Sequence, residues 1–95
     1  AEGRDELVAV VYGADWCKPC DAAVRYLKRL GVEVVKKDVE SDQLAAREMQ
    51  DKLRRANLPP NASIPIIDVG GQLLMGYSPQ ALQRAVEAAR GAKPL

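Results

Sequence analysis

The sequence predicts a single α/β domain, built on a four-stranded mixed sheet with helices on both faces. Three observations favour this fold class. A chain of 95 residues suits one domain. Short β-branched apolar segments alternate with longer segments of helical apolar spacing. Two adjacent glycines, Gly70 and Gly71, join the last two apolar segments as a tight hairpin turn. The predicted order is βαβαββα.

The first third of the chain is expected to form a strand–helix–strand unit. Residues 7–12 are apolar throughout, which is typical of a central strand covered on both faces. Residues 13–16 form a loop, and helical spacing of apolar residues runs from Cys17 until Gly31 ends the helix. Residues 32–37 follow as a second strand. The two strands are therefore parallel and joined by a right-handed crossover.

A second helix is expected to begin at Ser41, which can cap it. Its predicted apolar stripe consists of Leu44, Ala45, Met49, Leu53 and Ala56. The opposite face carries two favourable i,i+4 pairs, Glu48–Lys52 and Asp51–Arg55. We interpret these charges as a solvated helix face.

The last third of the chain begins with a loop over residues 57–63. A strand over 64–69 and its antiparallel partner over 72–75 follow. Ser78 is expected to cap the last helix, with Pro79 at its first position. The apolar stripe of this helix is formed by Ala81, Leu82, Ala85, Val86 and Ala89. We expect a domain over 7–90, a disordered or cloning-derived end over 1–6 and a frayed end over 91–95.

Composition excludes several classes of function. The chain has 14 Lys+Arg against 13 Asp+Glu, a net charge of +1, and so lacks the basic patch that nucleic acid requires. Its longest apolar run, residues 7–12, falls far short of the roughly 20 residues that span a bilayer. The absence of His excludes Ser-His-Asp and Cys-His catalysis within the chain. We expect no metal, no nucleic acid and no membrane insertion.

The two cysteines stand three residues apart in Trp16-Cys17-Lys18-Pro19-Cys20. A loop this short adds little stability when closed, because the constraint on the unfolded chain grows with loop length. A structural zinc site usually needs four ligands, and the chain offers two. The spacing leaves three interpretations, which are a redox pair, inert thiols and a metal site shared between subunits.

Together with Ile64-Pro65 at the start of the third strand, this motif and the element order resemble the thioredoxin fold in its minimal form. In particular, the chain is similar to glutaredoxins and glutaredoxin-like redoxins, over about residues 8–89. The resemblance implies a cis peptide bond before Pro65, where an ordinary strand-edge proline is the alternative. It also implies a dithiol–disulfide oxidoreductase that reduces protein or small-molecule disulfides through a mixed disulfide.

The sequence departs from both branches of the superfamily. Trp16 and Pro19 resemble thioredoxins, but Val11 stands where thioredoxins carry a buried acid. Ala14 stands where glutathione-using glutaredoxins commonly have Lys. Residues 76–79, Gly-Tyr-Ser-Pro, replace their Gly-Gly-x-Asp run and are closer to the glutaredoxin-like electron donors of ribonucleotide reductase and to small exported glutaredoxin-domain proteins. We therefore expect no resident cofactor, weak use of glutathione as co-substrate, and better use of a protein reductant.

Position along the first helix suggests the catalytic roles. Cys17 lies at the helix start, where the macrodipole and unpaired N–H groups favour a thiolate, so we expect an exposed nucleophile with a lowered pKa. Cys20, one turn later, is expected to be the buried resolving thiol. The expected substrate-binding residues are Trp16, Lys18, Pro19, Ile64, Pro65, Gly76 and Tyr77.

Two other classes of function remain open. One is a non-catalytic thioredoxin-like interaction module. The other is a [2Fe–2S] carrier that bridges two subunits through Cys17 and external thiols, which Pro19 disfavours. For the leading interpretation we expect a monomer whose partners are disulfide-containing proteins and a reductase or glutathione. A cytoplasmic location is slightly favoured over an exported or periplasmic one with the signal removed.

Overall fold

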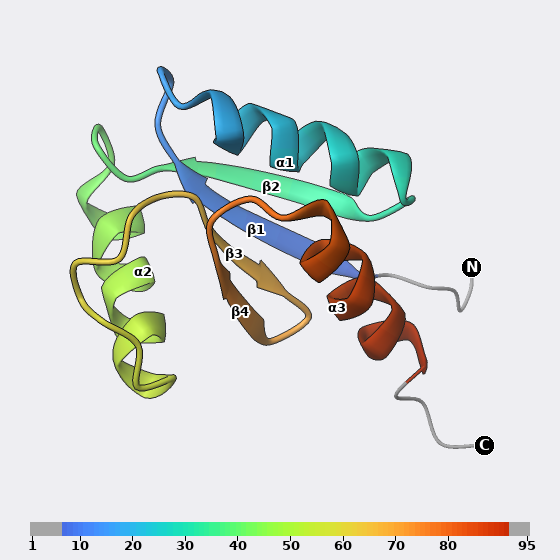
Figure 1. Cartoon of the computed structure of the whole chain (residues 1–95). Coiled ribbons are helices and arrows are strands. Elements are labelled where there is room, and N and C mark those ends of the chain that lie inside the picture. The colour runs from blue at the N-terminus through green and yellow to red at the C-terminus, as the bar shows by residue number, and fades with distance from the viewer. Residues whose placement is uncertain (1–6, 92–95) are drawn as a thin grey trace.

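The computed structural model describes residues 7–91 of the chain, and Figure 1 shows its elements. The expectations for residues 1–6 and 92–95 lie outside the described residues. The elements of the described part are β1 (Val8–Gly13), α1 (Lys18–Arg29), β2 (Glu33–Asp38), α2 (Gln43–Arg55), β3 (Ile66–Val69), β4 (Gln72–Met75) and α3 (Pro79–Gly91). This is the predicted order, with element ends that differ by a few residues from the prediction.

The four strands form one mixed sheet in the order β2-β1-β3-β4. β1 runs parallel to β2 and antiparallel to β3, and β3 runs antiparallel to β4. Val10 in β1 therefore lies between Val35 of β2 and Asp68 of β3. The central position of β1 explains why its sequence is apolar on both faces. The predicted minimal thioredoxin fold is confirmed.

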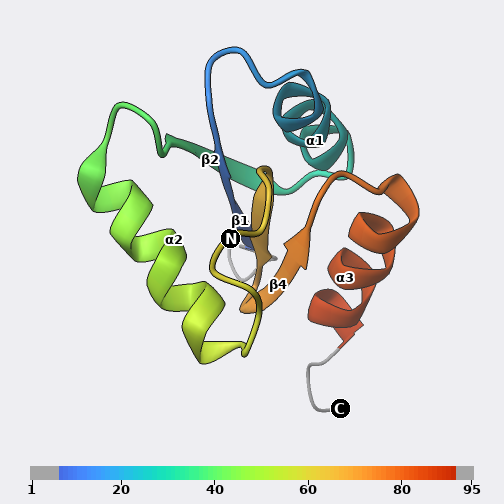
Figure 2. The same ribbon diagram turned by 60° about the vertical axis from the view of Figure 1, so that its left-hand side comes forward.

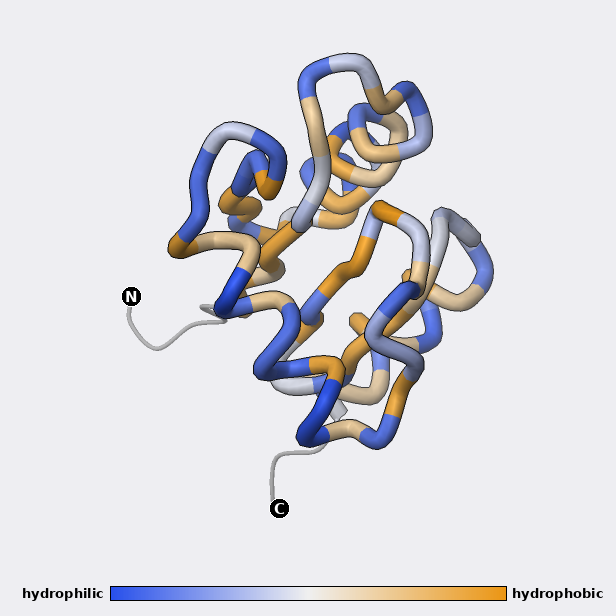
Figure 3. The backbone as a smooth tube through the Cα atoms, turned by 90° about the vertical axis from the view of Figure 1, so that its left-hand side faces the viewer, coloured by the Kyte–Doolittle hydropathy of each residue, from blue (hydrophilic) through white to orange (hydrophobic). Residues whose placement is uncertain are grey.

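Helices cover both faces of the sheet, and they separate the core into two clusters. α1 and α3 pack on one face and α2 on the other (Figures 1 and 2). Adjacent residues of β1 point to opposite faces, so that Val11 joins the cluster under α1 and α3 while Tyr12 joins the cluster under α2. Figure 3 shows apolar residues concentrated along the strands, with alternating polarity along the helices.

The start of α2 differs from the sequence prediction. Asp42, and not Ser41, caps the helix, because its carboxylate accepts the main-chain N–H groups of Leu44 (3.0 Å) and Ala45 (3.2 Å). Leu44 and Ala56 were expected in the apolar stripe, but both are exposed. Leu44 precedes the buried Ala45 by one residue, which places it about 100° around the helix and away from the sheet.

The predicted pair between Glu48 and Lys52 is wrong. Glu48 accepts hydrogen bonds from Lys37 (2.9 Å) and from the hydroxyl of Tyr12. Lys52 instead pairs with Asp68 of β3 at 2.6 Å. Both groups sit on the side of α2 that borders the sheet, where partly buried partners interact more strongly than solvated neighbours on the same helix.

Several local predictions are confirmed. Asp51 and Arg55 pair at 3.0 Å on the exposed side of α2. Gly70 and Gly71 turn the β3–β4 hairpin with φ of +56° and +99°, which glycine adopts without strain. Ser78 caps α3, since its hydroxyl accepts the N–H of Ala81 at 3.2 Å.

Within residues 7–91, no helix is long and apolar enough to cross a membrane.

Candidate redox site

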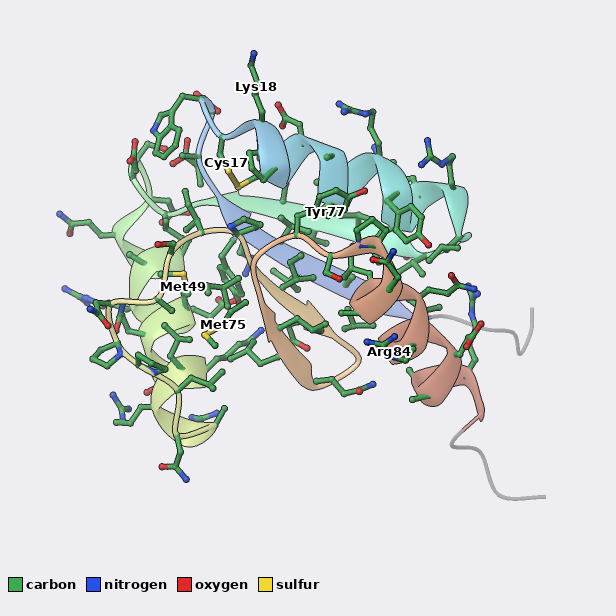
Figure 4. The ribbon with its side chains drawn as sticks, in the orientation of Figure 1. Cys17, Lys18, Met49, Met75, Tyr77 and Arg84 are labelled. Carbon is green, nitrogen blue, oxygen red and sulfur yellow. A yellow bond between two sulfur atoms is a disulfide. The ribbon has the colours of Figure 1, made fainter. Side chains whose placement is uncertain are left out.

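The cysteine pair lies at the N-terminal end of α1, where the chain leaves β1 and turns into the helix (Figure 4). Cys17 and Cys20 form a disulfide, with Cα atoms 5.2 Å apart. Cys17 is the N-cap, and its sulfur accepts the N–H of Cys20 at 3.2 Å. Pro19 occupies the first turn, where no intrahelical N–H bond is lost. A tight turn, closed by a bond from the N–H of Cys17 to the carbonyl of Ala14 (3.2 Å), delivers the motif to the helix.

Both cysteines are buried, with 2% of Cys17 and none of Cys20 exposed. The sequence-based expectation of an exposed Cys17 is therefore wrong for the disulfide form. The pair belongs to the apolar cluster under α1 and α3, which Ile64 and Tyr77 also contact. Position at a helix start predicts an exposed nucleophile, but the cysteine pair is part of a buried cluster to which distant parts of the chain contribute.

Gly13 lies against Cys20, although the sequence predicts only a loop residue there. A Cβ atom added to Gly13 would lie 2.6 Å from the sulfur and 2.9 Å from the Cβ of Cys20. No side chain fits at this position without a shift of its neighbours. The available signal was a glycine directly after an apolar strand, which often marks a close approach of another group to the backbone.

Trp16, the residue before Cys17, is an exposed apolar residue next to the cysteine pair. Its side chain is 65% exposed, and the indole N–H donates to Oε1 of Glu40 at 2.8 Å. The carboxylate of Asp38 accepts the main-chain N–H groups of Glu40 (2.8 Å) and Ser41 (3.1 Å), which lowers the pKa of Asp38. The turn after β2 therefore fixes Glu40, and Glu40 orients Trp16.

Two lysines lie near the start of α1 in different environments. Lys18 is exposed and extends into solvent (Figure 4). Lys36 of β2 pairs with Asp21, the residue after Cys20, at 2.9 Å. The charge of Asp21 is thus offset within the protein, whereas the charge of Lys18 lies in solvent.

Of the expected site residues in the second half of the chain, Ile64 and Tyr77 pack against the cluster that contains the cysteine pair. The Ile64–Pro65 bond is cis, as the resemblance implied, and Pro65 is fully buried. The carbonyl of Pro65 accepts the N–H of Gly76 at 2.8 Å, which holds the two loops together. Tyr77 is half-buried, and its ring meets that of Tyr26 edge-on at 6.5 Å between α1 and α3 (Figure 4). Among the described residues, none forms a main-chain hydrogen bond with Ile64.

The glutaredoxin family model matches residues 9–74 of the chain. The match includes both cysteines and the cis-proline, and it ends before Gly76 and Tyr77. No curated protein matches the sequence significantly.

Solved structures of related redox proteins share the fold. The thioredoxin-like protein BC3987 is 25% identical, with a TM-score of 0.66 over 81% of this chain and 97% of that one. A glutaredoxin from Methanosarcina mazei Go1 is 20% identical, with a TM-score of 0.70 over 90% and 84%. NrdH-redoxin from Escherichia coli, described as a glutaredoxin-like protein with a thioredoxin-like activity profile, is 19% identical, with a TM-score of 0.60 over 81% and 92%.

Proposed function

The chain belongs to the glutaredoxin family, and from this premise we propose that it is a dithiol–disulfide oxidoreductase that reduces disulfides of proteins or small molecules. The observation that carries the proposal is the Cys17–Cys20 pair, at disulfide distance and at a helix N-terminus. The chain offers no other cysteine and no histidine, so this pair is the chemistry available for thiol exchange.

In the proposed cycle, the thiolate of Cys17 attacks one sulfur of a substrate disulfide. A mixed disulfide forms, and the other substrate sulfur leaves as a thiolate. Cys20 then loses its proton and attacks the sulfur of Cys17, which closes the Cys17–Cys20 disulfide and releases the second substrate thiolate. Two electrons have passed from the protein to the substrate, and an external thiol reductant returns the pair to the dithiol.

The surroundings of the two sulfurs support this order of attack. The N–H of Cys20 points at the sulfur of Cys17 at 3.2 Å, and the N-terminal end of α1 favours negative charge there. Cys20 is fully buried behind it and lies against Gly13. We therefore assign the first attack to Cys17, at the helix N-terminus, and the resolving step within the mixed disulfide to Cys20.

We assign substrate binding to the surface around Cys17. Trp16 offers an exposed apolar face, and Lys18 offers a positive charge beside it. The main chain of Ile64 has no hydrogen-bond partner in the described part of the protein, which leaves it able to pair with an extended substrate segment. The main-chain hydrogen bond from the N–H of Gly76 to the carbonyl of Pro65 holds the segment next to Ile64 in place.

For the electron source we propose a protein reductant in preference to glutathione. Ala14 is fully buried and carries no charge to meet a glutathione carboxylate. Charge-assisted hydrogen bonds contribute about 1.5–3 kcal/mol each, so the loss of one weakens binding by roughly tenfold or more. The N-terminus of α3, capped by Ser78, still offers N–H groups to an anion, which leaves room for weak glutathione binding.

Reduction of insulin and of hydroxyethyl disulfide tests the proposal, with thioredoxin reductase or glutathione as alternative electron donors. We expect Cys17→Ser to abolish turnover and to trap no substrate. Cys20→Ser is expected to accumulate mixed disulfides that mass spectrometry detects at Cys17. Wild-type protein without cysteine-dependent turnover on either substrate would instead indicate a non-catalytic interaction module, and glutathione kinetics as fast as those with the reductase would contradict the choice of donor.

A further inference from the structure

Gly13 ends β1 at the point where the strand meets the cysteine pair. Its φ lies outside the left-handed region, so backbone conformation does not require glycine here. Space does, because an added Cβ would lie 2.6 Å from the sulfur and 2.9 Å from the Cβ of Cys20. The next nearest atom is Cε of Lys36 at 3.8 Å, an ordinary contact. The room at Gly13 is therefore limited by Cys20.

We propose that Gly13 is a positioning residue that favours the disulfide over the dithiol. The absence of a side chain at Gly13 provides the space that the Cys20 sulfur occupies when it is bonded to Cys17. This inference rests on the proposed function, since it assigns Gly13 a role in the equilibrium through which the redox cycle passes.

The physical reason is a difference between the two redox states. In the disulfide, the Cys20 sulfur is held by covalent bonds on both sides and stays near Gly13. In the dithiol, the side chain is free to turn about χ1 to another staggered position, so the sulfur can move away from an added methyl group. The contact with the Cβ of Cys20 is the same in both states. A methyl group at residue 13 therefore raises the free energy of the disulfide more than that of the dithiol.

Equilibration with dithiothreitol measures this difference. Dithiothreitol gives two electrons and two protons to the Cys17–Cys20 disulfide, which yields two protein thiols and cyclic oxidised dithiothreitol. For Gly13→Ala we expect the equilibrium constant to shift at least tenfold toward the reduced protein, which corresponds to a potential about 30 mV less negative. The reduced fraction is counted by thiol alkylation and mass spectrometry across a series of dithiothreitol ratios.

Gly91→Ala is the matched control, because an added Cβ at Gly91 meets nothing within 4 Å. It should leave the equilibrium constant unchanged. Urea unfolding of both redox forms completes the thermodynamic cycle that links stability to the redox equilibrium. We expect Gly13→Ala to destabilise the oxidised form more than the reduced form. Equal destabilisation of the two forms with an unmoved equilibrium would show that Gly13 is only a packing residue and would overturn the proposal.

A second pair of variants covers the case in which Gly13→Ala does not fold. In Cys20→Ala the sulfur is absent but the Cβ remains, so Gly13→Ala in this background measures the Cβ contact alone. If oxidised Gly13→Ala does not fold, its loss of stability is at least the whole stability of the oxidised wild type. A smaller loss in the Cys20→Ala background supports the proposal, and a loss of the same size contradicts it. The insulin assay reports the proposed function separately, because the equilibrium with dithiothreitol needs no physiological substrate.

Discussion

The two faces of the sheet are stabilised in different ways. Under α1 and α3, the buried cluster is apolar apart from the disulfide, and Val11, Leu27 and Leu82 are fully buried there. Under α2, the fully buried Tyr12 donates its hydroxyl to Glu48, which also accepts from Lys37. The buried cluster of the redox face is therefore stabilised by apolar packing, whereas the α2 face combines apolar packing with charged hydrogen bonds.

Lys52 extends the polar network of the α2 face. Its ammonium lies 4.9 Å from the centre of the Tyr12 ring and pairs with Asp68 at 2.6 Å. The positive charge thus joins the helix to two strands at once. On the redox face, Lys36 beside Val11 pairs with Asp21 of α1 at 2.9 Å, but within residues 7–91 no charged group forms a hydrogen bond with a side chain of the buried cluster.

The stability of the α2 face should therefore depend on pH through Tyr12 and Glu48. Burial and the hydrogen bond to Glu48 raise the pKa of Tyr12 above its ordinary value of 10.0. The hydrogen bonds from Tyr12 and Lys37 lower the pKa of Glu48 below its ordinary value of 4.5. The stability that Tyr12 contributes is present below pH 10 and is lost as the pH rises above it. The stability that Glu48 contributes is present above about pH 4.5 and is lost as the pH falls below it.

The largest expected effect comes from a cavity on the α2 face. Leu53 is 1% exposed in that cluster, so Leu53→Ala should lower the free energy of unfolding by about 2–5 kcal/mol. The sheet separates this cavity from the disulfide, and we expect the equilibrium with dithiothreitol to remain unchanged. Urea unfolding and thiol alkylation measure the two quantities, and a potential that moves with stability would show that the faces are coupled.

The second-largest expected effect comes from removing the hydroxyl of Tyr12. Tyr12→Phe keeps the ring beneath Lys52 but removes the donor to Glu48, and we expect a loss of about 1.5–3 kcal/mol at pH 7. The variant should also lack the part of the stability loss above pH 10 that ionisation of Tyr12 causes in the wild type. Denaturation at a series of pH values measures both quantities, and unchanged stability at pH 7 would show that the Tyr12 hydroxyl does not stabilise this face.

A smaller effect is expected from Glu48→Gln, because the side chain is 39% exposed and solvent screens part of its interaction. We expect a loss of about 0.5–1 kcal/mol at pH 7 and a shallower decline of stability below pH 4.5 than in the wild type. Glu33→Gln, an exposed substitution on β2, is the control and should retain the wild-type acid profile. Identical acid profiles for wild type and Glu48→Gln would contradict the inference that ionised Glu48 stabilises the α2 face.

The smallest effect concerns the rim of the redox site. Glu40→Gln weakens the acceptor that orients Trp16, and we expect turnover with insulin to fall about threefold. Turnover with hydroxyethyl disulfide, which is too small to cover Trp16, should not change. An equal loss with both substrates would mean that Glu40 acts on the cysteines and not through the indole.

Much of the fold was predictable because its signals are local. Apolar spacing placed each helix and strand, the Gly70–Gly71 turn fixed the hairpin, and Ser78 marked the start of α3. The cap of α2 was assigned to Ser41, one residue early, because Asp42 is an equally good cap and local sequence does not choose between them. The exposure of Leu44 was missed for a related reason, since the direction of a helix face depends on where the sheet lies.

The sequence by itself determined the cysteine pair, the element order and hence the family of folds, because these depend on spacing along the chain. Only the tertiary structure decided that Cys17 is buried, that Glu48 binds Lys37 and Tyr12, and that Gly13 lies against Cys20. Each of these contacts joins groups from different elements. The strength of such a contact depends on burial and distance, which periodicity and turn chemistry along the chain do not contain.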